Sequence, residues 1–116
     1  MKKPFLYSML CMLLLGGCSG QSDTPPANIL KPQAMVRLMI DLHLSESKAM
    51  QVRVPGDTVR YVYTAFKERA LKKNNTDSAT FNRSFKWYSS HTDLMDKVYA
   101  DVVDSLGVRE TKGDWY

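Results

Sequence analysis

The stretch PQAMVRLMIDLHLSESKAMQV, residues 32–52, decides the fold because its apolar side chains cover most of a helical circumference. Pro32 suits the first turn of a helix, where its missing N–H is not needed. The main apolar stripe has helical spacing and comprises Met35, Leu38, Met39, Leu42, Ala49 and Met50. Val36, Ile40 and Leu44 widen that stripe. A helix that is apolar nearly all round is buried nearly all round, so this segment predicts a central helix.

Three further helices are expected around it, at residues 57–73, from 76 or 77 to 88, and at 93–106. Asp57 is a suitable N-cap for the second helix, and Gly107 is a suitable C-terminal cap for the fourth. Their inward faces are predicted to be Val59, Val62, Tyr63, Phe66 and Ala70; Phe81, Ser84, Phe85 and Tyr88; and Met95, Val98, Tyr99, Val102 and Leu106. No segment alternates with a period of two. The predicted fold class is therefore all-α: a small bundle of about four helices, two longer, one short and one C-terminal, after a flexible tether.

The N-terminus has the features of a bacterial lipoprotein signal peptide. Lys2-Lys3 precede an apolar run at 5–15, and Leu15-Gly16-Gly17 lead into Cys18. The run is shorter than the roughly 20 residues that a membrane-spanning helix needs. We expect residues 1–17 to be removed and Cys18 to be acylated, with no cofactor other than this covalent lipid. The alternative is an uncleaved anchor with Cys18 as an ordinary core cysteine.

The rest of the chain divides into a tether at 18–28, which starts with the acylated cysteine, a helical domain at 29–107 and a tail at 108–116. Cys11 would leave with the signal peptide, so the mature chain has no thiol for a disulfide or a metal site. It would keep 14 basic and 12 acidic residues, a net charge of about +2. This balance argues against a nucleic-acid partner, which requires a clustered basic face.

The densest basic cluster lies near the end of the second helix, at Lys67, Arg69, Lys72 and Lys73. Cations at a helix C-terminus are stabilised by the helix dipole, so we expect a solvated helix end. The alternative is a binding patch, for which anionic lipid headgroups would be the natural partner.

His43 and Glu46 form a candidate polar site on the central helix. Residues three apart can touch, and both positions lie within or beside the apolar stripe, so the pair is expected to be buried. The hydrogen-bonding partners that a buried carboxylate needs could be Tyr63, Ser84, Tyr88 and Arg60. The pair then forms either a structural polar network or a ligand site. With His91 it could also supply three zinc ligands, but the spacing does not require a metal. Asp41 lies on the polar side and is expected to pair with Arg37.

Trp87 is a candidate contact for a protein partner, together with the terminal Trp115-Tyr116. A domain of this size without disulfides rarely gains more than about 3–5 kcal/mol from its core, so docking on another protein would help it. Exposed aromatic residues are frequent at such interfaces. The alternative is that Trp87 packs under a loop and that the tail is disordered.

Several blocks of the sequence resemble one family. They are Ile29-Leu30-Lys31-Pro32 with Met35, Asp41-Leu42-His43-Leu44-Ser45-Glu46, Tyr63 with Phe66, Phe81-Asn82-Arg83-Ser84-Phe85-Lys86-Trp87-Tyr88, and Tyr99 with Val102. Together they are similar to the domain of unknown function 4296, which is found in small lipoproteins of the Bacteroidota envelope. Trp87-Tyr88 stands where that family commonly has a Tyr-Tyr pair. The family has no established activity, so the resemblance implies a location in the cell envelope and a fold but no reaction.

Two more expectations follow from this resemblance. Asp23 is the one carboxylate close after Cys18, whereas the surface-export signal of that group is an acidic run, so the periplasmic side of the outer membrane is favoured. The segments at Thr58, Ser78 and Ser105 resemble the O-glycosylation tripeptide of the phylum. The aspartates before Thr58 and Ser78 are also ordinary helix caps.

The sequence contains no phosphate-binding loop, dinucleotide fingerprint, metalloprotease helix or serine-hydrolase elbow. We therefore expect a non-enzymatic accessory lipoprotein, held in the outer membrane by its lipid, whose helical domain binds another envelope protein. The alternative is a small-ligand or metal-binding domain built around His43 and Glu46.

Overall fold

The computed structural model describes residues 23–54, 56 and 58–113. Within these residues lie four helices and no strand: α2 (Pro32–Gln51), α3 (Thr58–Lys73), α4 (Ser78–Ser89) and α5 (Thr92–Lys112). The predicted all-α bundle of four helices is therefore confirmed. Among the described helices, none combines the length and apolar character needed to cross a membrane. The predicted signal peptide at 1–17 lies outside the described residues.

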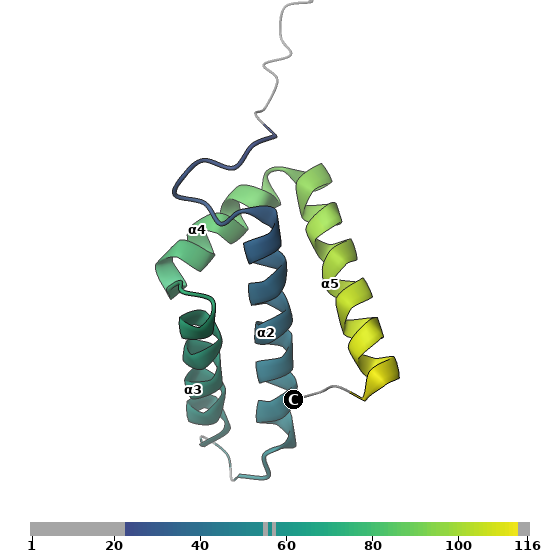
Figure 1. Cartoon of the computed structure of the whole chain (residues 1–116). Helices are drawn as coiled ribbons and strands as arrows, with labels where there is room; N and C mark the ends of the chain where they lie inside the picture. The colour runs from purple at the N-terminus through teal and green to yellow at the C-terminus, as the bar shows by residue number, and fades with distance from the viewer. Residues whose placement is uncertain (1–22, 55, 57, 114–116) are drawn as a thin grey trace, which may run out of the picture.

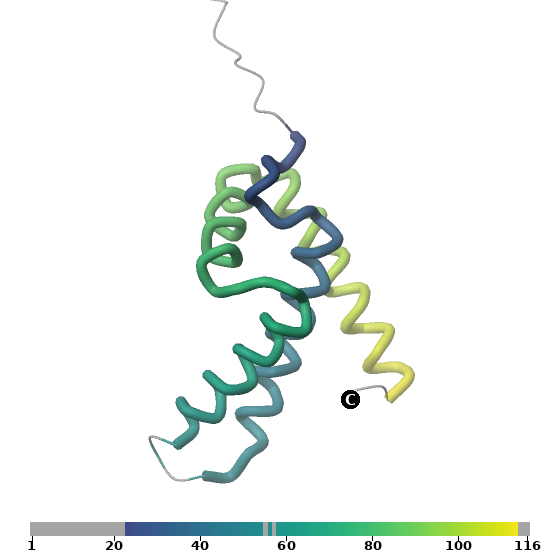
Figure 2. Tube along the Cα trace, turned by 60° about the vertical axis from the view of Figure 1, so that its left-hand side comes forward, coloured from purple at the N-terminus to yellow at the C-terminus, as the bar shows by residue number. Residues whose placement is uncertain are grey.

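The central position predicted for α2 is also confirmed. α2 packs against α3 on one side and α5 on the other, while α4 crosses near the end of α2 at Pro32 (Figure 1). α2 and α3 form an antiparallel hairpin. A second view shows the C-terminal end of α5 lying apart from the tip of this hairpin (Figure 2). The end of α2 at Pro32 is thus enclosed by other helices, and the end at Gln51 is more open.

The core lies at the enclosed end. One cluster joins the first half of α2 to α4 and α5 through Ile29, Met35, Met39, Ile40, Tyr88, Met95, Val98 and Val102. Leu38 is also fully buried, and Ala49, Ala70 and Leu71 are buried farther along the α2–α3 hairpin. Most of the predicted inward positions of α2 and α5 are therefore confirmed.

Several predicted inward residues are instead exposed. Met50 is 74% exposed, and Val59, Tyr63, Phe85 and Tyr99 are each 37–41% exposed. For Met50, Val59 and Tyr63 the physical reason is the divergence of the helices: α4 and the first half of α5 cover α2 near Pro32, but they do not reach its other end (Figures 1 and 2). Phe85 and Tyr99 lie on the covering helices themselves, at the edges of their inward faces. Apolar periodicity gives the side of a helix that is suited to burial, but it does not show how far along the helix a neighbour extends.

The segment before α2, residues 23–31, which we call the entry segment, is fixed to α4 by three hydrogen bonds. Arg83 Nε donates to the carbonyl of Asn28 at 3.2 Å, and the Leu30 N–H donates to Ser84 Oγ at 2.9 Å. Tyr88 Oη donates to the carbonyl of Leu30 at 2.9 Å, and its burial raises the pKa of the Tyr88 phenol. These bonds determine where the preceding chain, the predicted tether, enters the domain.

The helix ends follow ordinary capping chemistry, with one correction. Asp77 Oδ1 accepts a hydrogen bond from the Thr80 N–H at 2.7 Å, so this aspartate caps α4 as expected. α5, however, runs past Gly107 and ends at Gly113, which has a left-handed φ of 68°. The predicted end of this helix near Leu106 and the predicted tail from 108 are therefore wrong. Glycine inside a helix costs only about 1 kcal/mol, and the residues after it continue the helix.

Candidate functional site

Cys18, the predicted lipidation site, lies outside the described residues. Its acylation stays a prediction from the sequence. The described chain begins at Asp23, and residues 23–28 contain neither helix nor strand and are mostly exposed. Ile29 is the first buried residue of the described chain. The predicted division into a tether at 18–28 and a helical domain from 29 stays a prediction.

His43 and Glu46 are both exposed in the structure, so the predicted burial of this pair is wrong. Their stripe on α2 is the stripe of Met35 and Met39, which α4 and α5 cover only along the first half of the helix. Met50, on the same stripe near the far end, is exposed for the same reason. An exposed histidine and glutamate have water as a partner and need no buried network.

The hydroxyl groups of Ser84 and Tyr88 serve a different purpose from the one expected. Both bond to the backbone of Leu30 rather than to Glu46. A buried backbone N–H and C=O need partners as much as a side chain does, and α4 supplies them. These two residues therefore hold the entry segment in place.

The structure does not bring His43, Glu46 and His91 together as a zinc site. Across the described parts of the chain, no group of three or more His, Cys, Asp or Glu side chains is arranged to hold a metal ion. His91 lies between α4 and α5, where its ring stacks on Trp87 with centroids 3.8 Å apart. Its Nδ1 is 2.7 Å from the Trp87 carbonyl oxygen. These contacts give His91 a structural role.

Asp41 does not pair with Arg37 as predicted but joins α2 to the end of α3. Its carboxylate accepts hydrogen bonds from Lys73 Nζ at 2.9 Å and from Asn74 Nδ2 at 2.8 Å. Ser45 Oγ, one turn farther along, donates to the Asp41 carbonyl at 2.7 Å. The packing of α3 against α2 places Lys73 within reach, which spacing along α2 alone could not reveal.

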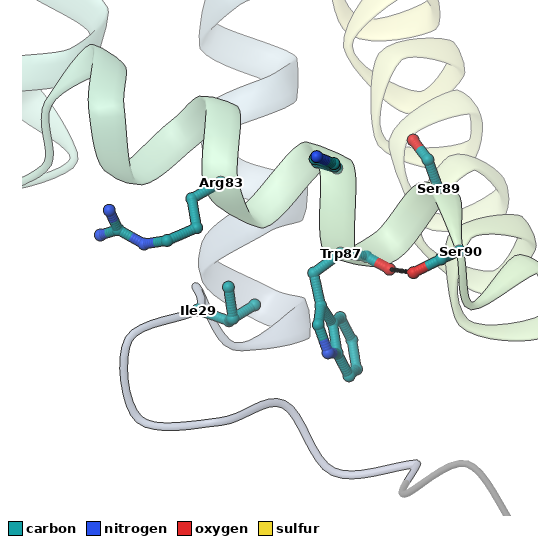
Figure 3. Close-up of a pocket in the computed structure, with 6 residues that line it drawn as sticks. Ile29, Arg83, Trp87, Ser89 and Ser90 are labelled. Atoms are coloured by element: carbon teal, nitrogen blue, oxygen red, sulfur yellow. Dashed lines mark hydrogen bonds between the residues drawn. The ribbon is translucent and has the colours of Figure 1, made fainter.

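Trp87 belongs partly to the core. It packs against the core cluster and meets Tyr88 edge-on, with centroids 5.0 Å apart. Its indole lies beside Ile29 and forms one wall of a shallow pocket of about 490 Å³, which Arg83 and Lys86 also line (Figure 3). Trp87 is therefore half-buried beside the segment that precedes α2. Its role as a partner contact stays a prediction, and Trp115-Tyr116 lie outside the described residues.

The open end of the α2–α3 hairpin carries large apolar side chains that face solvent. We call this group the hairpin tip: Met50, Val52, Val59, Tyr61 and Tyr63. Met50 and Tyr61 are 74% and 70% exposed. The hairpin tip lies at the opposite end of α2 from the entry segment (Figure 1), and a helix of 20 residues is about 30 Å long.

A second pocket, of about 420 Å³, lies between α2, α3 and the C-terminal half of α5. We call it the basic pocket. Its lining residues are Asp41, Leu44, Ser45, Lys48, Phe66, Arg69, Ala70, Lys73 and Arg109. Arg69 and Lys73 belong to the basic cluster predicted from the sequence, whereas Lys48 and Arg109 were not predicted. Lys112-Gly113, a basic residue before a glycine, is the signal that could have extended α5 as far as Arg109.

These features define a small all-α domain built on one central helix, with an enclosed apolar end and an open end. A family model described as "Domain of unknown function (DUF4296)" matches residues 26–112. The chain therefore belongs to this family, as the sequence blocks indicated. No curated protein matches the chain, and no solved structure matches it.

Proposed function

We propose that this protein is an accessory lipoprotein of the outer membrane, facing the periplasm, whose helical domain binds another envelope protein and catalyses no reaction itself. The sequence Leu15-Gly16-Gly17-Cys18, which is typical of the end of a lipoprotein signal peptide, supports the anchor. If Cys18 carries more than one acyl chain, attachment to the bilayer is stable without a membrane-spanning helix.

The observation that carries the proposed binding function is the position of the hairpin tip. The described chain enters the domain at the end of α2 near Pro32, and the hairpin tip lies at the other end (Figure 1). An anchor that precedes residue 23 would leave these exposed apolar side chains free to face away from the bilayer. A protein in the periplasm is then their natural partner.

The composition of the hairpin tip also fits a protein interface. Tyrosine and methionine are enriched at interfaces, because each buries a large apolar surface. Tyr61 supplies a rigid ring with a polar hydroxyl, and Met50 supplies a flexible apolar side chain. Both lie on elements that are held by the packing of α2 against α3. His43 and Glu46, by contrast, form no enclosed site, so no observation favours a ligand site built around this pair.

The anchor is tested by labelling cells with radioactive palmitate and comparing the native chain with Cys18→Ala. We expect the native chain to take up label and to sediment with the outer membrane, and the variant to lose both properties. An unlabelled native chain, or one found in the cytosol, would refute the lipoprotein assignment.

The binding function is tested by site-specific photo-crosslinking of the full chain in intact cells. A crosslinking amino acid is placed at Tyr61 or Met50, and, as matched controls, at Glu68 on α3 and Asn82 on α4, which are also exposed. We expect one protein to be captured at the two hairpin-tip positions and at neither control. Capture of the same abundant proteins at all four positions, or of none at the tip, would contradict the proposal.

A further inference from the structure

We propose that the basic pocket binds a phosphate ester that has a small apolar part. The charge and the lining of the pocket favour such a ligand, and this binding would not depend on any partner at the hairpin tip.

The pocket exists because α5 continues past Gly107. At about 100° per residue, Arg109 lies within about 20° of the direction of Val98 around α5, so it follows the inward stripe of Val98 and Val102. Both valines are buried against the core. The C-terminal end of α5 lies apart from the tip of the hairpin (Figure 2). The stripe therefore changes from apolar to cationic toward the C-terminal end of α5, and Arg109 lines a cavity instead of the core.

The charge of the lining strongly favours an anion. Lys48, Arg69, Lys73 and Arg109 contribute four positive charges from three helices, and Asp41 contributes one negative charge. Asp41 is bound to Lys73 at 2.9 Å. The lining thus has a clear positive excess, and cations that face one cavity repel one another. A bound dianion would relieve this repulsion and would gain charge-assisted hydrogen bonds.

Two of the four cations are arginines, which suit phosphate because the planar guanidinium can donate two parallel hydrogen bonds. Arg69 lies over the Phe66 ring, with Cζ 6.0 Å from the ring centroid. This contact supports the side chain at the wall of the pocket. Arg109 approaches from the opposite helix, so a phosphate between them could be held from two sides.

The remaining lining gives the ligand its apolar part. Leu44, Phe66 and Ala70 supply apolar surface on α2 and α3. The Ser45 hydroxyl donates to the Asp41 carbonyl at 2.7 Å and lies 3.4 Å from the Phe66 carbonyl oxygen, so its proton is already engaged by the backbone. A cavity of about 420 Å³ falls within the range of small-molecule sites. An organic phosphate therefore fills it better than inorganic phosphate does.

Phosphate esters of this kind occur both as soluble metabolites and as lipid headgroups. The shared chemistry is a phosphate monoester next to a short apolar group. Separate arms of the test distinguish these two sources.

The test measures binding to the full chain, purified in an uncharged detergent, by calorimetry at constant ionic strength. The probes are inorganic phosphate, propyl phosphate, a water-soluble short-chain phosphatidic acid and succinate. We expect the two organic phosphates to bind at least tenfold more tightly than inorganic phosphate or succinate. Tighter binding of propyl phosphate identifies the soluble source, and tighter binding of the short-chain lipid identifies the headgroup.

Matched variants show whether the ligand occupies this pocket. Arg69→Gln and Arg109→Gln should each weaken binding at least tenfold. Lys97→Gln removes the same charge from an exposed position on α5 and should change binding less than twofold. Circular dichroism of each variant checks that the helices are retained.

Two outcomes overturn the proposal. One is that none of the four probes binds more tightly than chloride does. The other is that Lys97→Gln weakens binding as much as Arg109→Gln, because the effect would then come from overall charge. Neither outcome affects the hairpin-tip crosslinks, so the pocket and the proposed function can fail separately.

Discussion

The two halves of α2 are built from similar residues but have different surroundings. Residues 32–40 lie in the enclosed half, where Met35 and Leu38 are fully buried. Residues 41–51 lie in the open half, where Ser45 and Ala49 are buried against α3 but Met50 is exposed. One continuous helix therefore serves as the core of the domain at one end and as an accessible surface at the other.

The difference lies in the size of the residues that are buried. Large side chains fill the enclosed half, and dispersion and apolar burial both grow with side-chain size. Ser45, Ala49 and Ala70 let the backbones of α2 and α3 approach but bury little apolar area. Stability is therefore expected to come mainly from the enclosed half, while both proposed binding surfaces lie in the open half.

The largest expected effect comes from a paired truncation along α2. Leu38→Ala leaves a cavity in a fully buried site and should lower the free energy of unfolding by about 2–5 kcal/mol. Met50→Ala removes a side chain that is 74% exposed and should change it by less than about 0.5 kcal/mol. Urea titration followed by circular dichroism measures both.

Since a domain of this size has a small margin of stability, Leu38→Ala could leave little folded protein. The milder change Leu38→Val then serves as the quantitative variant, measured against Met50→Ala in the same buffer. Equal losses at the two positions would contradict the division of α2 into an enclosed and an open half.

The second prediction concerns the hydrogen bond by which Tyr88 holds the entry segment at the enclosed end of α2. Tyr88→Phe keeps the ring but leaves the Leu30 carbonyl without its partner at 2.9 Å, so it should cost about 1–2 kcal/mol. Burial raises the pKa of Tyr88 in the folded state. The stability linked to its neutral form is therefore complete below its unfolded pKa, which is about 10, and is lost as the pH rises above it.

The pH profile separates this effect from a simple loss of packing. Tyr88→Phe should flatten the fall in stability on the alkaline side, whereas Tyr61→Phe, at an exposed position, should leave the profile unchanged. A native profile that stays flat above pH 10 would show that the Tyr88 hydroxyl contributes no titratable stability.

The enclosed half was predictable from the sequence, and much of the open half was not. Apolar periodicity correctly identified Met35, Leu38, Val98 and Val102 as buried, because residues at helical spacing share one face whatever covers it. The same periodicity suggested burial of His43 and Glu46, which is wrong. Whether a face is covered depends on the lengths and crossing of other helices, and those depend on contacts distant in sequence.

The basic pocket was missed for a related reason. Arg69 and Lys73 are close in sequence and were noticed as a cluster, whereas Lys48 and Arg109 come from two other helices. Their convergence requires that α5 continue past Gly107. One wrongly placed helix end was therefore enough to conceal a site that three helices build.

The third prediction concerns Gly107 and Gly113, whose substitution by alanine should have opposite effects on stability. Gly107 lies inside α5, and a Cβ there would meet nothing within 4 Å. Gly107→Ala should therefore stabilise the domain by up to about 1 kcal/mol. Gly113 ends the helix with a φ of 68°, which alanine adopts unfavourably, so Gly113→Ala should destabilise it by about 1 kcal/mol.

Thermal unfolding of the two variants checks both signs. If Gly107 were the cap that its sequence context suggests, Gly107→Ala would be destabilising. That result would mean that α5 ends near Gly107. Arg109 would then not line the basic pocket, which would have only α2 and α3 as walls.

The smallest effect is expected at Asp77, an exposed residue where the chain passes from α3 to α4. The Thr80 N–H donates to its carboxylate at 2.7 Å, and this bond holds the pKa of Asp77 below its ordinary value. Since the folded-state pKa is lowered, the stability contributed by Asp77 is present above its unfolded pKa and is lost as the pH falls through the folded value. Asp77→Ala should remove this contribution and shift the thermal midpoint slightly downward at neutral pH.

Asp77→Asn keeps a side-chain oxygen that can cap α4 but cannot titrate. It should therefore retain most of the stability at neutral pH and lose less than the native chain as the solution is acidified. α4 encloses the end of α2 at Pro32, so loss of this cap should act mainly on the enclosed half. Circular dichroism of the variants at low pH measures how much helix is lost. If Asp77→Ala also changed binding of a phosphate ester in the basic pocket, the two halves would be coupled through α3, and their separation along α2 would be incomplete.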